Sequence, residues 1–328
     1  MFYGMINLIK MLSYHEWQGV NMSREKILKK LGFPVPGKQL RVIIDTDAKN
    51  EADDQYAIIH HLLSPMLDIR GITASHFESK AKIPGETMER SYQEILKVLK
   101  LAQMEEISVY RGCIFPLKNE ADTPSSDAVE FIISEARREE TPLYIAVLGT
   151  MTNVAAALNR DPDIASRLIV LWNGGGPYPV GRREFNLMQD IYACRVLLKS
   201  QAEVWQIPQN VYGSLEVTLA ELAQKVRPCG ELGTYLFSQL VEQNMRDYNP
   251  NFLLRTGENW TLGDNTTVAV LLMNRFRGNW HMRKAPLIQP DMTYQEDPEG
   301  KLIRVYDSID VRMTLEDLFA KLAMAYRT

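Results

Sequence analysis

The chain has 328 residues, of which 45% are hydrophobic and 24% are charged, and its formal net charge is −4. The hydrophobic share can bury a substantial core, and the mild acidity argues against nucleic acid as a partner, because phosphate backbones bind basic surfaces. The three cysteines, Cys113, Cys194 and Cys229, lack CxxC spacing, which predicts neither a disulfide framework nor a zinc site and favours a reducing, cytoplasmic location.

The N-terminal segment is apolar but short. Residues 1–13 cannot span a bilayer, and no small-residue cleavage site precedes Tyr14. We therefore expect neither a signal peptide nor a membrane location. We interpret residues 1–21 as a disordered extension, or as a segment that precedes the true start at Met22, and residues 22–328 as a single domain.

Strands and helices are predicted to alternate from residue 41 onward. The run Arg41–Ile44 is rich in β-branched residues and predicts a buried strand, and Asp53–Leu63 has apolar residues at helical spacing. Ser125 or Ser126 is a plausible N-cap for a later helix. The other predicted elements are strands at Ile69–Thr73, Ile107–Tyr110, Leu143–Leu148 and Leu168–Trp172, and helices at Glu86–Ala102, Ser126–Glu139 and Val154–Leu158.

This alternation predicts an α/β fold with an open, mostly parallel sheet covered by helices. Ligands of such sheets bind at the carboxyl ends of the strands, so we expect the active site at that edge. Residues 214–262 have a largely helical pattern and are expected to cap it.

An acidic loop directly follows the first predicted strand. The ten residues from Asp45 to Asp54 contain five acidic side chains, which repel one another unless a cation or water screens them. Oxygen ligands in an irregular loop favour Ca²⁺ or Mg²⁺ over Zn²⁺. The alternative is a solvated loop in which Asp53 or Asp54 caps the next helix.

Four segments resemble motifs of the nucleoside hydrolase family, in the family's order. The acidic loop resembles its signature D-x-D-P-G-x-D-D, and Gly149–Asn153 resembles its G-P-L-T-N turn. Asn173–Gly176, followed by Glu184-Phe185-Asn186, resembles its G-G segment and E-F-N motif, and Gly263-Asp264 lies where the family has H-D-P. The resemblance spans most of the chain. It implies the nucleoside hydrolase fold, a homodimer or homotetramer, and calcium-dependent hydrolysis of the N-glycosidic bond of a ribonucleoside or similar ribosyl compound.

The resemblance also implies a set of metal ligands. Asp47, Asp54 and Asp264 would bind Ca²⁺ through their carboxylates, together with the backbone carbonyl of Thr152. Asp47 would also act as general base toward a water molecule on the metal. Asp45 would orient the loop from behind these ligands.

The same resemblance implies the residues that bind the substrate. Asp53 would accept a hydrogen bond from a ribose hydroxyl, and Glu184 and Asn186 would hold the 5′-hydroxyl side of the sugar. Asn173 would contact the substrate from the end of its strand. Nearby carboxylates would stabilise the oxocarbenium character that develops on the sugar.

Three departures from the family pattern concern the loop and the leaving group. Six positions separate Asp47 from Asp53 where the family has four, so Lys49 is either a competitor of the metal, a contact for an anionic substituent or a solvent-exposed side chain. The histidine of H-D-P, which protonates the departing base in many members, is replaced by Gly263. We consider His76, or stacking on Trp260, as its replacement. The segment Ser75–Glu78 also replaces the family's G-N and its amide.

Two other functions remain open from the sequence. A non-catalytic nucleoside or sugar binder would account for the missing histidine. A Mg²⁺-dependent phosphohydrolase would use Asp45-Thr46-Asp47 after the first strand, but Asp53-Asp54 and the E-F-N segment fit that class poorly.

Overall fold

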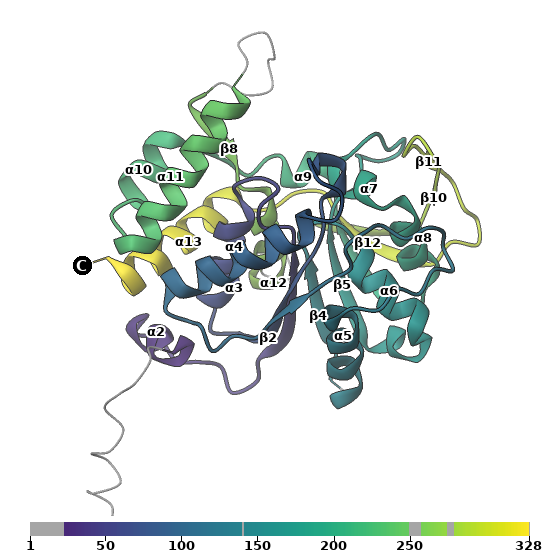
Figure 1. The fold of residues 1–328 in the computed structure, drawn as a ribbon, viewed down its shortest axis with the longest axis horizontal. Helices are drawn as coiled ribbons and strands as arrows, with labels where there is room; N and C mark the ends of the chain where they lie inside the picture. Colours follow the sequence, from purple (N-terminus) through teal and green to yellow (C-terminus); the bar gives the residue numbers. More distant parts are fainter. Residues whose placement is uncertain (1–22, 140, 249–256, 274–278, 328) are drawn as a thin grey trace, which may run out of the picture.

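A computed structural model describes residues 23–139, 141–248, 257–273 and 279–327, and its centre is an eight-stranded sheet (Figure 1). The strand order is β3-β2-β1-β4-β5-β6-β12-β9, and every neighbouring pair is parallel except β12 and β9. This confirms the predicted mostly parallel sheet. Its strands are β1 Leu40–Thr46, β2 Leu67–Ala74, β3 Val109–Arg111, β4 Leu143–Val147, β5 Leu168–Asn173, β6 Glu203–Ile207, β9 Trp280–Lys284 and β12 Leu302–Tyr306.

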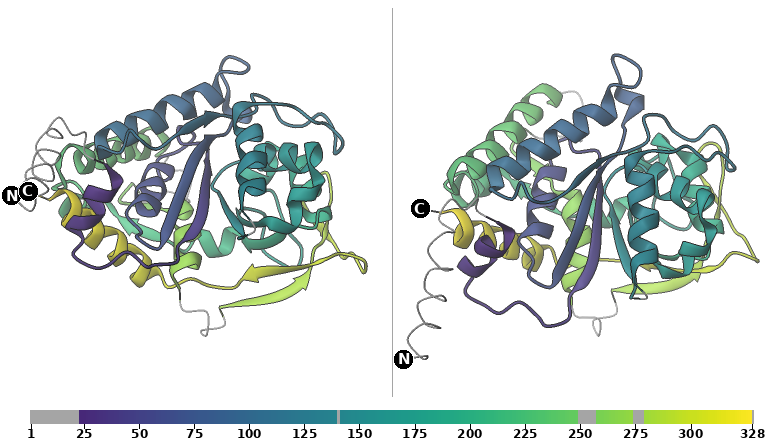
Figure 2. Two further views of the ribbon diagram at one scale, coloured as in Figure 1. Left: turned by 90° about the horizontal axis from the view of Figure 1, so that it is seen from below. Right: turned by 60° about the horizontal axis from the view of Figure 1, so that its bottom comes forward.

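Helices cover both faces of the sheet and bury a separate apolar core on each (Figures 1 and 2). One core is formed with α2 Arg24–Lys30, α3 Asp54–Leu62, α4 Thr87–Ala102, α10 Leu219–Lys225, α11 Gly230–Asp247, α12 Thr266–Leu272 and α13 Val311–Tyr326. The other is formed with α5 Asp127–Arg138, α6 Thr152–Arg160, α7 Phe185–Gln189 and α8 Ile191–Lys199. Because both faces are covered, the central strands are continuous apolar runs, and Val42, Ile43 and Ile44 of β1 are fully buried.

Short elements complete the chain. The helix α9 spans Gln209–Tyr212, and the 3₁₀ turns are η1 Glu78–Lys80, η2 Pro162–Arg167 and η3 Gly263–Asn265. Two small antiparallel pairs join β7 Glu216–Thr218 to β8 Asn259–Thr261, and β10 Leu287–Ile288 to β11 Tyr294–Gln295. None of the helices in the described ranges is long and apolar enough to cross a membrane.

The helix boundaries refine the predicted ones. Ser126 caps α5 by accepting a hydrogen bond from the backbone N of Val129 at 3.3 Å, as expected for one of the two candidate serines. Asp53 precedes α3, but its side chain makes no capping hydrogen bond. The predicted helical cap consists of α10 and α11 with the β7–β8 pair. Part of it, residues 249–256, lies outside the described residues, as does the predicted extension 1–21.

The sheet brings five loops to its carboxyl edge. They follow β1, β2, β4, β5 and β6, and η3 reaches the same edge from the C-terminal half. The acidic loop Asp47–Asp53, the turn after β4 and the Gly-rich segment after β5 therefore meet, although more than a hundred residues separate the first from the last.

Candidate active site

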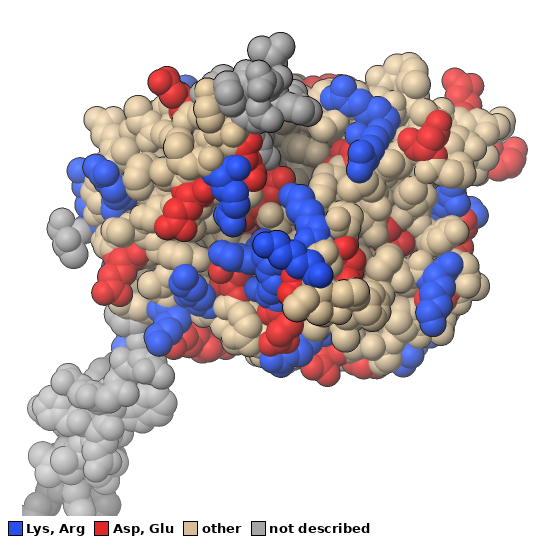
Figure 3. All heavy atoms as spheres, turned by 45° about the horizontal axis from the view of Figure 1, so that its top comes forward, with Lys and Arg blue, Asp and Glu red and all other residues tan. Residues whose placement is uncertain are grey.

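A cavity of about 580 Å³ lies at the carboxyl edge of the sheet. The face turned toward the viewer in Figure 3 is hollowed near its upper centre, with Asp and Glu atoms beside the hollow. Among the residues that the structure describes, Arg182 is the one basic side chain that lines the cavity. The acidic lining residues are Asp47, Glu51, Asp53, Asp54, Glu184 and Asp264.

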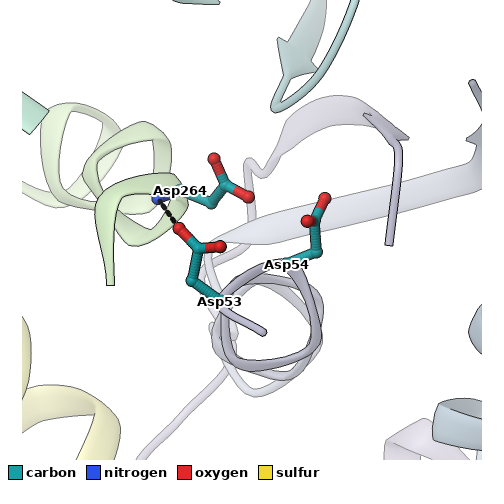
Figure 4. A group of neighbouring side chains, drawn as sticks. All are labelled: Asp53, Asp54 and Asp264. Carbon is teal, nitrogen blue, oxygen red and sulfur yellow. Dashed lines mark hydrogen bonds between the residues drawn. The ribbon is translucent and has the colours of Figure 1, made fainter. Parts of the chain in front are cut away.

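Asp53, Asp54 and Asp264 form a cluster that is suited to a metal ion (Figure 4). Each offers one carboxylate oxygen, and these oxygens lie within 4.8 Å of one another. The backbone N of Asp264 donates a hydrogen bond to Asp53 Oδ2 at 3.3 Å, which holds η3 against the start of α3. Asp53, expected on the substrate, thus lies in the same group as two of the expected ligands.

Asp47 lies beside this cluster and is buried. Its Oδ2 has no hydrogen-bond partner within the described part of the chain. A Cβ atom at position 149 would lie 2.7 Å from Asp47 Cγ, so Gly149 leaves the space that this carboxylate occupies. The turn after β4 is therefore shaped around Asp47.

The electrostatics of the cluster are compatible with a bound cation. Burial raises the pKa of Asp54 to about 6, although hydrogen bonds with Thr46 and Asp264 oppose the shift. Burial also raises the pKa of Asp47 and Asp264 well above the usual range, and neighbouring carboxylates raise both further. Buried like charges of this kind are stabilised by a divalent cation, and their hard oxygens suit Ca²⁺ or Mg²⁺. The residues present therefore fit the metal that the sequence predicts.

The backbone at the end of β4 differs from the expected ligand set. Thr152 is the first residue of α6, so its carbonyl points along the helix. It does not line the cavity, and its Oγ1 donates a hydrogen bond to Asp190 Oδ2 at 2.7 Å. Leu148 does line the cavity, and its carbonyl accepts a hydrogen bond from Asn186 Nδ2 at 2.6 Å. Of these two residues, Leu148 is the one that lines the cavity.

Glu184 is buried and fully hydrogen-bonded by the chain. Its Oε1 accepts from the backbone N of Asn186 at 3.0 Å and from Tyr212 Oη at 2.8 Å. Its Oε2 accepts from the backbone N of Gly175 at 2.8 Å and of Leu187 at 2.9 Å. Glu184 is therefore the N-cap of α7 as well as part of the cavity wall.

Hydrogen bonds of Asn173 and Asn186 connect the carboxyl ends of β4 and β5 to the acidic cluster. Asn173 Nδ2 donates to Asp264 Oδ1 at 2.8 Å, and its Oδ1 accepts from Thr266 Oγ1 at 3.0 Å. Asn186 Nδ2 donates to the carbonyls of Leu148 and Asn173 at 2.6 and 2.8 Å. Both asparagines, predicted to contact the substrate, line the cavity.

Asp45 is buried behind the cavity on β1. Its Oδ2 accepts from Thr73 Oγ1 at 2.6 Å and from Asn153 Nδ2 at 2.8 Å, which links β1, β2 and α6. Burial raises the pKa of Asp45 to about 6. A phosphohydrolase would need Asp45 in the cavity beside Asp47, so this position does not support that alternative.

The two expected replacements for the leaving-group histidine do not line the cavity. His76 is buried, its Nε2 lies 2.9 Å from Thr152 Oγ1, and burial lowers its pKa to about 4. Trp260 packs in the core beneath the cap. Lys49 forms an ion pair with Glu94 at 3.2 Å and turns toward α4 rather than toward the cluster.

Tyr212 packs against Gly263, the residue at the position of the missing histidine. A Cβ atom at Gly263 would lie 3.0 Å from Tyr212 Cδ2, so the ring packs where the missing histidine side chain would begin. Sequence reasoning missed Tyr212, Leu148 and Arg182. Tyr212 belongs to a short helix after an unpredicted strand, and Leu148 contributes only backbone, so neither has a signal in the residue pattern.

Comparison with known proteins gives consistent matches. The model of the family described as inosine-uridine preferring nucleoside hydrolase matches residues 42–316. Pyrimidine-specific ribonucleoside hydrolase RihA of Salmonella paratyphi A is 26% identical to the chain over 229 residues, which are 62% of this chain and 70% of that protein. A plant nucleoside hydrolase structure is similar with a TM-score of 0.69 at 22% identity, covering 88% of this chain and 99% of its own. The structure of a purine-preferring ribonucleoside hydrolase from Gardnerella vaginalis is similar with a TM-score of 0.67 at 22% identity. The match covers 87% of this chain and 99% of that chain.

Proposed function

Because the chain belongs to the inosine-uridine preferring nucleoside hydrolase family and is an N-glycosidase, we propose that it hydrolyses ribonucleosides or similar ribosyl compounds in a calcium-dependent reaction. The observation that carries this proposal is the group of buried carboxylates at the cavity, which raise one another's pKa values.

The proposed metal ligands combine the carboxylate cluster with neighbouring residues of the cavity. Asp54 and Asp264 of the cluster would hold Ca²⁺ together with Asp47, which lines the same cavity, and Asp53 lies in the same cluster. The Leu148 carbonyl would take the place of the expected Thr152 carbonyl. When bound, the cation would make water more acidic and bind sugar hydroxyls.

The chain's own residues would supply the base and the positioning. Asp47 Oδ2, a buried oxygen without a hydrogen-bond partner among the described residues, would take the proton of the attacking water. Asp53 would accept a hydrogen bond from a ribose hydroxyl, and the surrounding carboxylates would stabilise positive charge on the sugar. Asn173 and Asn186 would keep these groups in place. Good orientation of the reactants can lower the activation barrier by about 7–11 kcal/mol.

The leaving-group side would be apolar rather than acidic. Tyr212 and Phe185 line the cavity, whereas His76 and Trp260 do not. We propose that the base packs against these two rings, which would contribute about 0.5–1.5 kcal/mol beyond burial. We assign no side chain of the described cavity lining as the acid that protonates the departing base.

A substrate panel with and without metal tests the function. The full chain is incubated with purine and pyrimidine ribonucleosides plus Ca²⁺, and release of reducing sugar is measured. We expect turnover that disappears with a chelator and returns with added Ca²⁺. Tight binding without turnover would instead indicate a non-catalytic nucleoside binder and overturn the proposal.

Two expectations about the whole protein accompany this proposal. We propose a homodimer or homotetramer, which light scattering after size-exclusion chromatography tests directly. We also propose a cytoplasmic location, which the three buried, unpaired cysteines support because a reducing compartment keeps thiols free. Cell fractionation of the native host, with activity as readout, tests the location.

A further inference from the structure

The wall of the cavity around Glu184 differs from one built to bind a free hydroxyl. A carboxylate has about four acceptor sites, and Glu184 already accepts four hydrogen bonds from the chain. The Tyr212 hydroxyl fills the site on Oε1 that faces α9. A 5′-hydroxyl of a substrate sugar would have to displace Tyr212 before it could donate to Glu184.

A cationic side chain lies on the same side of the cavity. The Nε of Arg182 donates to Gln209 Oε1 at 2.8 Å, and the backbone N of Gln209 donates to the carbonyl of Gly175 at 2.9 Å. The backbone N of Gly175 in turn donates to Glu184 Oε2. This chain of contacts links the guanidinium to Glu184 through Gln209 and Gly175.

Arg182 is available for a ligand. It is exposed, it lines the cavity, and within the described ranges no acidic side chain pairs with it. The Nε–Gln209 bond anchors the guanidinium, and paired guanidinium N–H groups match the oxygens of a phosphate. Arg182 is also the basic member of a cavity lining with six acidic residues.

We propose that the preferred substrate is a ribosyl compound with a phosphate on its 5′ oxygen, and that Arg182 binds this phosphate. The inference rests on the proposed function and names its substrate class. In the reaction the N-glycosidic bond breaks and its electron pair leaves with the base nitrogen, which takes up a proton from solvent water. The oxygen of the attacking water bonds to the anomeric carbon, one of its protons goes to Asp47, and Asp47 returns this proton to solvent after the products leave. The products are ribose 5-phosphate and the free base.

Kinetics with three matched substrates tests the proposal. A nucleoside, its 5′-monophosphate and its 5′-deoxy analogue are compared by kcat/KM in the presence of Ca²⁺. We expect the monophosphate to be preferred and the 5′-deoxy analogue to match the nucleoside, because Glu184 has no acceptor site left for the 5′-hydroxyl. Preference for the nucleoside over both others would overturn the inference and leave the proposed function intact.

Variants assign the selectivity to residues. R182A should lower kcat/KM for the monophosphate by roughly 10- to 100-fold more than for the nucleoside, as expected for a charge-assisted hydrogen bond. R183A is the matched control, because Arg183 contacts Met188 Sδ and does not line the cavity. Y212F frees Glu184 Oε1 and should raise kcat/KM for the nucleoside relative to kcat/KM for its 5′-deoxy analogue. Equal losses on all substrates in R182A would contradict the role of Arg182.

Binding measured without turnover separates the two proposals. Calorimetric titration of the calcium-loaded protein with ribose 5-phosphate and with ribose should give tighter binding of the phosphate, and R182A should remove most of the difference. If no substrate is hydrolysed but this preference remains, the proposed function fails and the phosphate subsite stands. If ribose binds as tightly as ribose 5-phosphate, the subsite inference fails whatever the activity.

Discussion

Asp47 combines burial with an unpaired oxygen. Its side chain is 2% exposed, and Oδ2 has no partner among the described residues, while an unsatisfied buried polar group costs about 1–3 kcal/mol or more. In the proposed reaction this oxygen takes the proton of the attacking water. A buried oxygen that the described part of the chain leaves without a partner, and whose residue lines the cavity, is thus the one assigned to the chemistry.

The variant D47N tests this role. The amide keeps the size of the side chain but cannot take a proton, so we expect kcat to fall by about 10²–10⁴ at saturating Ca²⁺. Thermal stability of the metal-free protein should be unchanged or higher, because a buried ionisable group is replaced by a neutral amide. Steady-state kinetics and a thermal melt measure both. D163N, at an exposed position in η2, is the control that should behave like wild type, and an active D47N would remove Asp47 from the mechanism.

Gly149 offers a second test at the same carboxylate. In G149A the new methyl would lie 2.7 Å from Asp47 Cγ and force this side chain to move. Because displacement of about 1 Å can cost about 10²-fold in rate, we expect kcat to fall by about that factor. G37A is the matched control, since nothing lies within 4 Å of a Cβ there. Equal activity of both variants would show that Asp47 need not hold this position.

Some of the site residues predicted from the sequence line the cavity, and others do not. Asp54, Asp264 and Asn186 line the cavity because each is placed there by a motif at the end of a strand or the start of a helix. Thr152 does not, because a helix begins at this residue and turns its carbonyl away. Lys49 pairs with Glu94, a tertiary contact for which the loop sequence gives no signal.

At the scale of elements, burial explains which strands the sequence predicts. β1, β4 and β5 are covered on both faces and are therefore continuous apolar runs, and their positions were predicted to within two residues. β6 was not predicted, since it includes Gln206, which is buried only because it bonds Tyr178 and Gly174. The edge strand β9 is mostly polar and half exposed, so it lacks an apolar pattern.

A buried ion pair joins elements at the end of the sheet opposite the cavity. Glu135 of α5 accepts hydrogen bonds from Arg41 of β1 and Arg70 of β2, and the Arg41 and Glu135 side chains are 5% and 8% exposed. E135A would leave Arg41 buried without this partner, so we expect a loss of about 3–5 kcal/mol in unfolding free energy. Urea unfolding measures this change.

The neighbouring glutamate provides the control for this prediction. Glu139 lies 3.7 Å from Arg41 Nε and its side chain is 46% exposed, so E139A should cost no more than about 1 kcal/mol. Both variants should keep the wild-type kcat, because these residues do not line the cavity. A similar effect of both substitutions would show that burial does not determine the strength of this pair.

At the scale of the whole molecule, the cavity is far more acidic than the net charge of the chain suggests. The net charge is only −4, yet Asp53 and Asp264, 211 positions apart, share a hydrogen bond in a cluster of carboxylates. The alternation of strands and helices predicts which edge carries the site. It does not predict which side chains converge there, because this depends on how η3 packs against α3.

The carboxylates at this edge make the metal-free protein less stable as pH rises. Burial raises the pKa of Asp54 to about 6, and the pKa values of Asp47, Asp53 and Asp264 well above the usual range. A carboxyl group with a raised pKa binds more protons in the folded than in the unfolded chain. Stability is therefore lost as pH rises from about 4 through the folded pKa of each group.

Buried histidines have the opposite effect on stability. Burial lowers the pKa of His61 to about 3 and that of His76 to about 4, so both favour folding more strongly as pH rises from about 4 to 6.5. A simple pH–stability curve mixes the two effects. The difference between calcium-loaded and chelated protein at one pH isolates the carboxylates, because the histidines contribute to both samples.

We therefore expect the calcium-induced rise in Tm to grow from pH 5 to pH 8. At a calcium concentration 100 times Kd the stabilisation is about 2.7 kcal/mol, and protons compete with the cation at low pH. Scanning calorimetry at each pH measures the rise. D264N, which removes one carboxylate, should reduce it at every pH. A rise of equal size at pH 5 and pH 8 would mean that the cation binds somewhere other than the buried carboxylates.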